Sequence, residues 1–374
     1  MKGYFIFYRD IDYNNLNGID KKVLSQVKTL KDVGIDCELT IMKSNKENFW
    51  HKLYNTITSR LPYGNSDPTW KYDRKFEDAN FLYFRRPTSL NYPMLKVLHK
   101  IKQNNPKIKI IMEIPTYPYD DELKSNLKDY PRYIKDKYNR RKLKGLVDRI
   151  AVQNNIDSIF QVPTLNFTNG IRVKDIEPRK PTKVDGITIC AVASMEPWQG
   201  YERIISGLAQ YYKNGGQEDI NIHLVGEGKE KTNYEKMVND FQLNSHIHFE
   251  GFLSGEKLEY IYAKSDIALD SFGRYKTKNE FSTSLKSREY LAKGLPIVSG
   301  SKVDIVSETF PYYYEFESNS TTVDFKKIVE FYHKVYSKDN TTEEVIKEIR
   351  AYAFEVCDMS KSMNEIISFI KNQK

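Results

Sequence analysis

The feature that most constrains this chain is an alternation of strand-like and helix-like segments that runs through it twice. Short apolar runs, the first from Gly3 to Arg9, alternate with segments whose apolar residues recur at helical spacing. The alternation pauses at residues 172–185, where Pro178, Pro181 and five Lys or Arg residues give a linker composition, and it restarts at Ile187. Repeated strand–helix units indicate a parallel sheet covered on both faces. We therefore predict an α/β fold with two doubly wound, Rossmann-like domains.

The element boundaries follow from the apolar runs and from the glycines and prolines between them. The predicted strands are residues 3–9, 37–42, 81–86, 108–114, 149–153 and 161–165 in the first half, and 187–193, 220–225, 247–252, 267–269 and 296–298 in the second. The predicted helices are residues 18–33, 90–103, 131–145, 200–212, 234–241, 255–264 and 284–293, with three more after residue 324. Residues 44–76, which contain Pro62, Gly64 and Pro68, are expected to form an irregular excursion.

The composition favours a folded protein with anionic partners. Hydrophobic residues make up 40% of the 374 and charged residues 29%, which is enough for a packed core and argues against general disorder. The net charge of +8 suits nucleotides, lipid diphosphates or a membrane surface, but it is too small for a dedicated nucleic-acid-binding protein.

The three cysteines, Cys37, Cys190 and Cys357, are too far apart in the sequence for a metal knuckle or a redox pair, and they fit a reducing compartment. No signal-peptide pattern opens the sequence, and no apolar run approaches the length that spans a bilayer. We therefore expect a cytoplasmic protein that can still touch the inner face of the cell membrane.

The most informative segment runs from Ser284 to Val298, with the sequence SLKSREYLAKGLPIV. A serine-containing loop enters a helix there, and a helix N-terminus presents N–H groups and a positive dipole end to anions such as a diphosphate. Lys286 lies in the first turn, where a cation is unfavourable unless a phosphate accompanies it. Glu289 shares its face and can accept two hydrogen bonds from ribose hydroxyls. The alternative is an ordinary amphipathic helix in which both charges are solvated.

This segment resembles the donor-binding signature of the retaining GT-B glycosyltransferases of family four, as found in bacterial polysaccharide assembly. In that family the second Glu of an E-x7-E motif holds the donor ribose, and Glu289 matches it. The first Glu of the motif falls on Phe281, one residue after Glu280.

Residues 193–203 resemble the first strand, loop and helix of the family's donor domain. Ser194 and Gln199 stand where the family usually has Arg and Lys. This departure leaves Lys286 as the residue expected to neutralise the diphosphate, with help from Arg203, Arg274 or Lys276.

Further segments are similar to other parts of the family's donor site. Residues 224–228 resemble a strand-end V-G-x-G, and residues 247–254 resemble the strand whose following residues line the nucleobase pocket. The resemblance implies a donor-binding set of Ser284, Leu285, Lys286, Glu289, Arg203, Gly226, Glu227, Gly228, Phe252, Leu253 and Gly18. The alternative for the glycines after the strand is a tight turn, and the alternative for Gly18 is the start of a helix capped by Asn17.

Two segments are expected to face the donor sugar or the acceptor. One is the loop after the strand at 267–269, and the other is the Pro-Thr-Tyr-Pro-Tyr run at 115–119, near the point where many family members carry a His. The candidate residues are Asp270, Ser271, Glu113, Thr116 and Tyr117. The alternative for the proline-rich run is a rigid loop. No catalytic base can be identified from the sequence.

The resemblance implies a GT-B architecture with an interdomain cleft. We expect an acceptor-binding domain at residues 1–172, a nucleotide-sugar-binding domain at 173–355, and a C-terminal helix within 356–374 that packs back on the first domain. The resemblance also implies transfer with retention from a nucleotide-diphosphate sugar, most simply a UDP-sugar, without a cofactor. No acidic D-x-D pair lies in a convincing loop position, so no metal is expected, and side chains and helix dipoles must meet the phosphate charge.

Residues 124–144 carry nine Lys or Arg residues against Asp129 and Asp136, with Tyr130, Tyr133 and Tyr138 between them. Basic and aromatic side chains on one element are typical of a membrane-interfacial contact. We therefore expect this stretch to lie against the bilayer and the acceptor to be a polyprenyl-diphosphate-linked sugar of a surface polysaccharide, such as a capsule or exopolysaccharide. The alternative is a solvated helix face and a soluble acceptor.

Two other functions fit the same residues. A sugar-nucleotide epimerase on the same fold would change the free sugar and form no glycosylated product. A non-catalytic sugar-nucleotide-binding subunit that supports a partner transferase is favoured by the missing Arg–Lys pair. The products formed from a sugar nucleotide distinguish the three functions.

Overall fold

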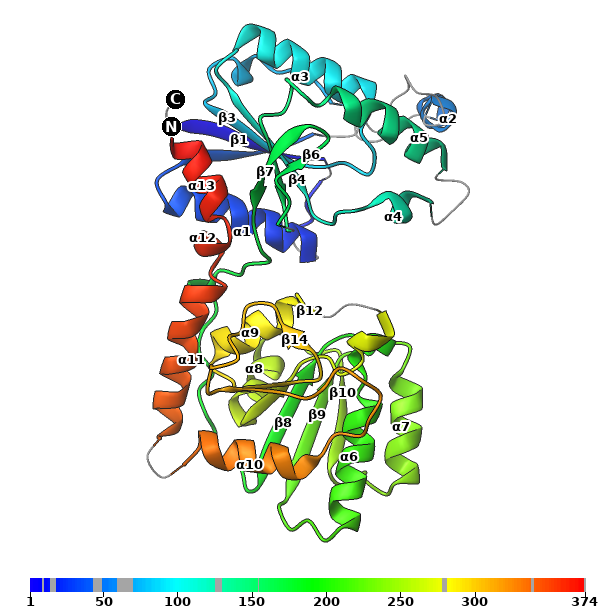
Figure 1. Cartoon of the computed structure of the whole chain (residues 1–374), viewed down its shortest axis with the longest axis vertical. Coiled ribbons are helices and arrows are strands. Elements are labelled where there is room, and N and C mark those ends of the chain that lie inside the picture. The colour runs from blue at the N-terminus through cyan, green and yellow to red at the C-terminus, as the bar shows by residue number, and fades with distance from the viewer. Residues whose placement is uncertain are drawn as a thin grey trace. The chain divides into compact units, whose positions relative to one another are not determined.

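The computed structural model in Figure 1 describes residues 1–8, 10–13, 18–42, 49–58, 70–124, 130–153, 155–277, 281–337 and 340–372. The chain divides into two compact units. Unit 1 is Met1–Thr168 together with Ser362–Lys374, and unit 2 is Asn169–Lys361. The chain therefore passes from one unit to the other after residue 168 and returns after residue 361, whereas the sequence placed these boundaries after residues 172 and 355.

Unit 1 is built on a seven-stranded sheet in the order β2-β1-β3-β4-β5-β7-β6. Its neighbouring strands are parallel except for β6, which is antiparallel to β7. The strands are β1 (Lys2–Phe7), β2 (Asp36–Ile41), β3 (Phe81–Arg85), β4 (Lys109–Ile114), β5 (Arg149–Val152), β6 (Ser158–Ile159) and β7 (Val162–Asn166). The helices are α1 (Gly18–Asp32), α2 (Phe49–Thr58), α3 (Tyr92–Asn104), α4 (Asp120–Lys124), α5 (Tyr130–Asn139) and α13 (Asn364–Lys371).

The central strands of unit 1 are apolar on both faces. In β4, residues 110–112 and Ile114 are all buried, which is typical of a strand covered by helices on two sides. Helix α1 lies on one side of the sheet, and α3 and α5 lie on the other (Figure 1). Strand β1 also depends on Gly3, because a Cβ there would lie 2.3 Å from the ring of Phe81 on β3.

Unit 2 contains a six-stranded parallel sheet in the order β10-β9-β8-β11-β13-β15 and a two-stranded sheet of β12 and β14. The strands are β8 (Ile187–Val192), β9 (Ile220–Val225), β10 (Ile247–Gly251), β11 (Ile267–Leu269), β12 (Phe281–Ser282), β13 (Ile297–Ser299), β14 (Lys302–Val303) and β15 (Tyr313–Glu315). The helices are α6 (Glu202–Lys213), α7 (Lys231–Asp240), α8 (Glu256–Lys264), α9 (Leu285–Lys293), α10 (Phe325–Val335) and α11 (Thr342–Val356), and α12 (Met359–Ser362) crosses the unit boundary.

The strand order of unit 2 reverses between β8 and β11. From β8 the chain winds outward through β9 to β10, and it then returns to the other side of β8 to form β11, β13 and β15. Helices α6 and α7 flank one side of the sheet, and α8 and α9 flank the other (Figure 1). In doubly wound sheets the loops that follow the two strands at such a reversal leave a crevice in which ligands bind. The residues that follow Val192 and Leu269 are therefore at the binding position of this fold.

Several elements differ from the sequence-based prediction. The helix predicted over 131–145 is shorter, because α5 ends at Asn139 and a 3₁₀ turn covers Arg140–Lys142. The region 44–76, which was expected to be irregular, contains α2. The short strands β6, β12, β14 and β15 were also not predicted. Among the described helices, none is both long and apolar enough to cross a membrane.

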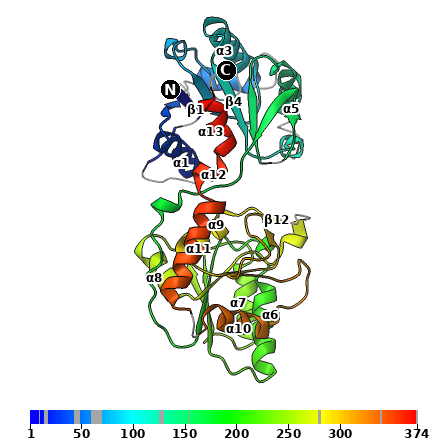
Figure 2. The same cartoon turned by 60° about the vertical axis from the view of Figure 1, so that its left-hand side comes forward.

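The C-terminal helix completes unit 1. Figure 2 shows α13 against the sheet of this unit, where it contacts β7. The ammonium of Lys109 on β4 donates hydrogen bonds to the carbonyls of Phe369 at 2.7 Å and Ile370 at 3.1 Å. The backbone N–H of Asn166 donates to Glu365 at 2.6 Å. The last helix of the chain thus belongs to the unit formed by the first 168 residues.

Candidate functional site

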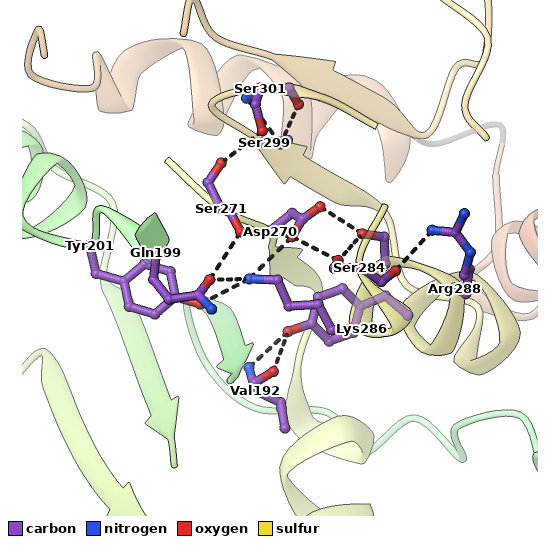
Figure 3. A network of polar contacts seen from close by, with 12 residues as sticks. Val192, Gln199, Tyr201, Asp270, Ser271, Ser284, Lys286, Arg288, Ser299 and Ser301 are labelled. Atoms are coloured by element: carbon purple, nitrogen blue, oxygen red, sulfur yellow. Dashed lines mark hydrogen bonds and ion pairs between the residues drawn. The ribbon is translucent and has the colours of Figure 1, made fainter. Parts of the chain in front are cut away.

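A polar network occupies the crevice position of unit 2 (Figure 3). Its central residues come from three elements: Gln199 follows β8, Asp270 directly follows β11, and Lys286 lies in the first turn of α9. These elements meet because β8 and β11 pair in parallel, so that their carboxyl ends lie at the same edge of the sheet. The topology therefore gathers residues that are more than seventy positions apart, as in the bond between Ser271 and Gln199.

Asp270 and Lys286 form a buried ion pair. The ammonium nitrogen of Lys286 lies 3.1 Å from Oδ1 of Asp270, and the two side chains are 11% and 0% exposed. The carboxylate also accepts hydrogen bonds from the hydroxyls of Ser287 at 2.6 Å and Ser284 at 3.3 Å. A buried carboxylate is stable only when it is paired with a cation and hydrogen-bonded, and Asp270 satisfies both conditions.

Burial and pairing act in opposite directions on the two charges. Burial raises the pKa of Asp270, but the Lys286 charge and the Ser287 hydrogen bond outweigh it and hold that pKa below its ordinary value. Burial lowers the pKa of Lys286, and the Asp270 charge offsets only part of this effect. An anion beside Lys286 therefore stabilises its charged form.

Two further side chains orient the Lys286 ammonium. It donates a hydrogen bond to Oε1 of Gln199 at 2.6 Å and lies 3.4 Å from the hydroxyl of Tyr201. The same Gln199 oxygen accepts a hydrogen bond from Ser271 at 3.0 Å. Gln199 stands at the position where the resembling family has a lysine. Here its neutral amide accepts a hydrogen bond from Lys286, a lysine that lies on α9.

The N-terminus of α9 adjoins the ion pair. Ser284 precedes the helix, yet its side chain makes no capping bond to a helix N–H. Its hydroxyl instead contacts Asp270 and the Ser287 hydroxyl, the latter at 2.9 Å, while Leu285 is 41% exposed. A helix start beside a lysine is an arrangement that binds phosphate, because the N–H groups and the dipole both favour an anion.

Glu289 lies one turn further along α9. One of its carboxylate oxygens accepts a hydrogen bond from the Tyr262 hydroxyl at 3.0 Å. Burial, together with the Glu289 charge, raises the pKa of Tyr262, so the phenol keeps its proton and remains a donor. Glu289 also lines a cavity of about 690 Å³ between α8, α9 and residues 175–182, a volume in the range of small-molecule pockets. The other predicted donor residues are not among the described residues that line it.

Gly226 and Gly228, which follow β9, pack closely against the loop after β8. A Cβ on Gly226, where φ is +131°, would lie 2.0 Å from the carbonyl oxygen of Ala193, and a Cβ on Gly228 would lie 2.5 Å from the nitrogen of Met195. These glycines are therefore required by backbone packing, and the structure favours the tight-turn interpretation over close approach of a ligand. Glu227 between them is exposed.

The segment after β10 exposes an aromatic ring. Phe252 is 80% exposed, and Leu253 is half-buried against the core of unit 2. An exposed ring at the carboxyl end of a parallel strand offers a face on which a nucleobase can stack. Phe252 therefore remains a candidate for contact with the base.

Arg203 is a structural residue, and the expectation that it helps to bind the diphosphate is corrected. Its side chain is buried, and the guanidinium donates hydrogen bonds to the carbonyls of Thr321 at 2.6 Å, Phe272 at 2.8 Å and Glu317 at 3.1 Å. These contacts join the start of α6 to the loops after β11 and β15. With its three nitrogens engaged by the backbone, Arg203 is not positioned to bind a ligand.

Glu113 is also internal, which corrects its expected contact with the donor sugar or acceptor. Its buried carboxylate accepts hydrogen bonds from Tyr83 at 2.6 Å, Gln26 at 2.8 Å and Arg85 at 3.0 Å. Burial raises the pKa of Glu113, but the charges of Lys22 and Arg85 outweigh this and hold the pKa below its ordinary value. The carboxylate thus ties α1 to β3 and β4.

The other candidates of unit 1 lie near its surface. Thr116 is exposed, and Tyr117 is half-buried, with its ring edge-on to the rings of Tyr119 and Phe160. Gly18 begins α1, is exposed and has open space around it, while its proposed cap, Asn17, lies outside the described residues, as does Glu280. These three candidates belong to unit 1, whereas Lys286 and Glu289 belong to unit 2.

The residues that support the charged side chains were missed by sequence reasoning. Ser287 bonds to Asp270, Tyr262 bonds to Glu289, and the buried guanidinium of Arg288 bonds to the Ser284 carbonyl at 2.9 Å and to Asp304 at 2.6 Å. The spacing of Ser284 and Ser287 was a usable signal, because residues three apart share a helix face. In the ranges that the structure describes, no group of three His, Cys, Asp or Glu side chains could hold a metal ion.

Comparison with known proteins places these observations in a family context. Residues 173–324 match the family model described as "Glycosyl transferases group 1". The crystal structure of a glycosyltransferase from Rickettsia africae matches with a TM-score of 0.61 and 12% sequence identity over 100% of this chain and 99% of that chain. Sucrose-phosphate synthase from Thermosynechococcus elongatus matches with a TM-score of 0.56 and 12% sequence identity over 99% of this chain and 98% of that chain. Anabaena Alr3699/HepE in complex with UDP matches with a TM-score of 0.54 and 12% sequence identity over 99% of each chain.

This chain has the GT-B fold. The predicted α/β class with two Rossmann-like domains is thereby confirmed. No curated protein matches the chain. Gln199, Asp270, Lys286 and Glu289 all lie in residues 173–324, so the polar network falls within the stretch that matches this family model.

The role of Glu289 can be tested by calorimetry. We expect Glu289→Ala to weaken UDP binding by about 5- to 150-fold, which corresponds to ~1–3 kcal/mol for lost ribose hydrogen bonds, without unfolding the protein. The matched control is Glu256→Ala, because Glu256 is exposed and lines the same cavity. An unchanged UDP affinity in the Glu289 variant would remove this residue from the site.

Proposed function

We propose that this chain is a retaining glycosyltransferase that transfers a sugar from a UDP-sugar to an acceptor hydroxyl. The observation that carries the proposal is the Lys286–Asp270 network at the crevice of a group 1 glycosyl transferase domain. Structures of the same fold support the choice of donor, since Anabaena Alr3699/HepE was solved with UDP and with UDP-glucose.

In this proposal Lys286 and the start of α9 bind the diphosphate. The Lys286 side chain retains 11% exposure, and its 3.4 Å contact with Tyr201 is long enough to be exchanged for a phosphate oxygen. Asp270 and Gln199 keep the ammonium in place and act as positioning residues. Glu289 binds the ribose hydroxyls, and Phe252 stacks on the base.

Catalysis in this proposal is electrostatic. As the bond between the donor sugar C1 and the diphosphate oxygen breaks, negative charge develops on the leaving phosphate. Lys286 and the N–H groups of α9 stabilise that charge. The acceptor hydroxyl forms the new bond to C1 on the same face, and its proton passes to the leaving diphosphate. The reaction then requires no protein base, no cofactor and no metal.

Product analysis tests the proposed function. With a panel of UDP-sugars in the presence of EDTA, we expect slow release of UDP, and with an acceptor we expect a glycoside that keeps the anomeric configuration of the donor. Transfer that EDTA abolishes and Mg²⁺ or Mn²⁺ restores would contradict metal independence. A changed free sugar, with no glycosylated product, would instead indicate an epimerase.

A non-catalytic binding subunit is the second candidate. The observation that favours it is the exposed Ser194 and the neutral Gln199 at positions where the family has Arg and Lys. Such a subunit would bind a UDP-sugar in calorimetry but release no UDP with any acceptor. The proposed transferase would bind the UDP-sugar and also release UDP when an acceptor is present.

We infer a membrane-borne acceptor, most simply a polyprenyl-diphosphate-linked sugar in surface polysaccharide assembly, with the protein acting at the inner face of the membrane. The net charge of +8 and the exposed basic residues of the stretch 124–144, among them Lys137, Arg141 and Lys142, support this part of the proposal. A transfer assay with lipid-linked and water-soluble acceptors compares the two classes directly.

A further inference from the structure

A hydrophobic face of unit 1 is not explained by sugar transfer itself. Helix α2 exposes Trp50 by 76%, Leu53 by 42%, Tyr54 by 58% and Ile57 by 56%. The spacing of these residues, i, i+3, i+4 and i+7, places them on one side of the helix. Large apolar side chains that gather on one exposed face mark an interaction site.

Helix α5 presents a second exposed row. Tyr130, Ile134 and Tyr138 recur every four residues and are 47%, 54% and 42% exposed. Together with the α2 row they form what we call the α2–α5 surface, which consists of Trp50, Leu53, Tyr54, Ile57, Tyr130, Ile134 and Tyr138. Both rows mix aromatic rings with aliphatic side chains, as helices at a membrane interface do.

The two helices are joined through a buried lysine. Lys135 on α5 is 1% exposed, and its ammonium donates a hydrogen bond to the carbonyl of Thr58, the last residue of α2, at 3.0 Å. The same buried side of α5 is fixed to the unit by Asp136 and Asn139, which bond to the N–H and the carbonyl of Leu90 at 2.8 and 3.0 Å. Figure 1 shows α2 beside α5. The buried contacts therefore hold the apolar rows outward.

Exposed cations border this surface. Lys137, Arg141 and Lys142 are exposed, and the Lys142 ammonium lies 4.3 Å from the ring centre of Tyr138. Other basic residues of the stretch 124–144 serve the fold, since Lys135 is buried and Arg140 pairs with Asp120 at 2.7 Å. The number of Lys and Arg residues in the sequence therefore overstates the charge that faces outward. Lys124 and Lys144 are also exposed, but Lys137, Arg141 and Lys142, all within four residues of Tyr138, are the cations expected to meet an anionic partner at this surface.

We propose that the α2–α5 surface docks on an anionic lipid bilayer. Its apolar and aromatic side chains enter the headgroup region, and Lys137, Arg141 and Lys142 meet the lipid phosphates. The combination of Trp, Tyr and aliphatic residues with a border of cations fits the boundary between water and hydrocarbon, where amphipathic rings are favoured. This inference rests on the proposed function for its purpose, because a lipid-borne acceptor requires contact with a bilayer, but docking is measured without any transfer reaction.

Trp50 provides a direct readout of docking. The full chain is mixed at low salt with vesicles of phosphatidylcholine and phosphatidylglycerol, and separately with vesicles of phosphatidylcholine alone. We expect co-sedimentation and a blue shift of tryptophan emission with the anionic vesicles, and both should weaken as salt is added. The other two tryptophans are less accessible, since Trp70 is buried and Trp198 is half-buried in unit 2. The emission shift is assigned to Trp50 if the Trp50→Phe variant loses the shift but still co-sediments with the vesicles.

Variants separate the two components of docking. Lys137→Gln with Lys142→Gln should weaken vesicle binding by about fivefold for each residue replaced. Leu53→Ser with Ile57→Ser should weaken it by roughly tenfold or more, because the apolar contact is lost. The matched control is Lys236→Gln with Lys257→Gln, which removes two exposed lysines from unit 2 and should change nothing.

Two outcomes would overturn the docking proposal. One is wild-type protein that ignores anionic vesicles at low salt. The other is self-association in solution that Leu53→Ser with Ile57→Ser abolishes, since the surface would then be an interface between two copies. UDP affinity measured without vesicles keeps this test separate from the proposed function, because the surface variants should bind UDP as the wild type does.

Discussion

Replacing Lys286 by methionine is expected to reduce both the stability of the protein and its affinity for UDP. The change leaves the Asp270 carboxylate buried without its cation, and breaking a buried pair in this way costs about 3–5 kcal/mol. The lost contact with the diphosphate should weaken UDP binding by about 10- to 150-fold, while uridine binding changes little. Urea unfolding and calorimetry with the two ligands measure these effects.

A double variant separates the two effects of Lys286. In Lys286→Met with Asp270→Asn, the buried residue is neutral, so we expect most of the free energy of unfolding to return while UDP affinity stays low. Equal losses of UDP and uridine affinity in the single variant would show that Lys286 does not contact the phosphates. A free energy of unfolding of Lys286→Met equal to that of the wild type would show that the ion pair with Asp270 does not stabilise the fold.

The second large effect is expected for Arg203→Met. This change removes three hydrogen bonds from the guanidinium to the carbonyls of Phe272, Glu317 and Thr321, and a hydrogen bond that involves a charged group contributes about 1.5–3 kcal/mol. We therefore expect the free energy of unfolding to fall by ~3 kcal/mol or more, with little change in the UDP affinity of the folded protein. Chemical denaturation and calorimetry on the same preparation test both parts.

Arg141→Met is the matched control for this prediction. Arg141 is exposed, so its replacement should change stability by no more than about 0.5 kcal/mol. If Arg203→Met were as stable as the wild type but bound UDP poorly, Arg203 would return to the donor site and its structural role would be refuted.

Much of the fold could be predicted because it depends on local patterns. The apolar runs that form the central strands, such as β4 and β8, are buried on both faces and are visible as continuous segments in the sequence. Helix α9 was predictable from the serine before it and from the Gly-Leu-Pro that ends it. The short strands β12 and β14 have two residues each, and such segments carry no periodic signal.

Helix α2 could have been predicted but was obscured by its surroundings. Trp50, Leu53, Tyr54 and Ile57 show helical spacing, yet prolines and a glycine follow within a few residues, and the aromatic content suggested an irregular excursion. Moreover, its apolar row faces outward, so that burial does not explain the pattern. Helical spacing of apolar residues therefore indicates a helix even where the segment lies outside the expected core.

The candidate site shows where sequence reasoning stops. Lys286 and Glu289 share a helix, so their relation was visible, but the partners of Lys286 come from strands that become neighbours only in the folded sheet. Whether Arg203 faces a ligand or the backbone depends on residues 317–321, more than a hundred positions away. The same uncertainty affected Glu113 on β4, whose partners lie on two other elements, α1 and β3.

The return of α13 to unit 1 has a consequence for biosynthesis. Residues 1–168 leave the ribosome first, but the helix that completes their unit is translated only after all of residues 169–361. Until then, Lys109 lacks the carbonyls of Phe369 and Ile370, and β7 lacks its covering helix. The unit that emerges first is therefore completed last, because its C-terminal helix is translated only after the whole of unit 2.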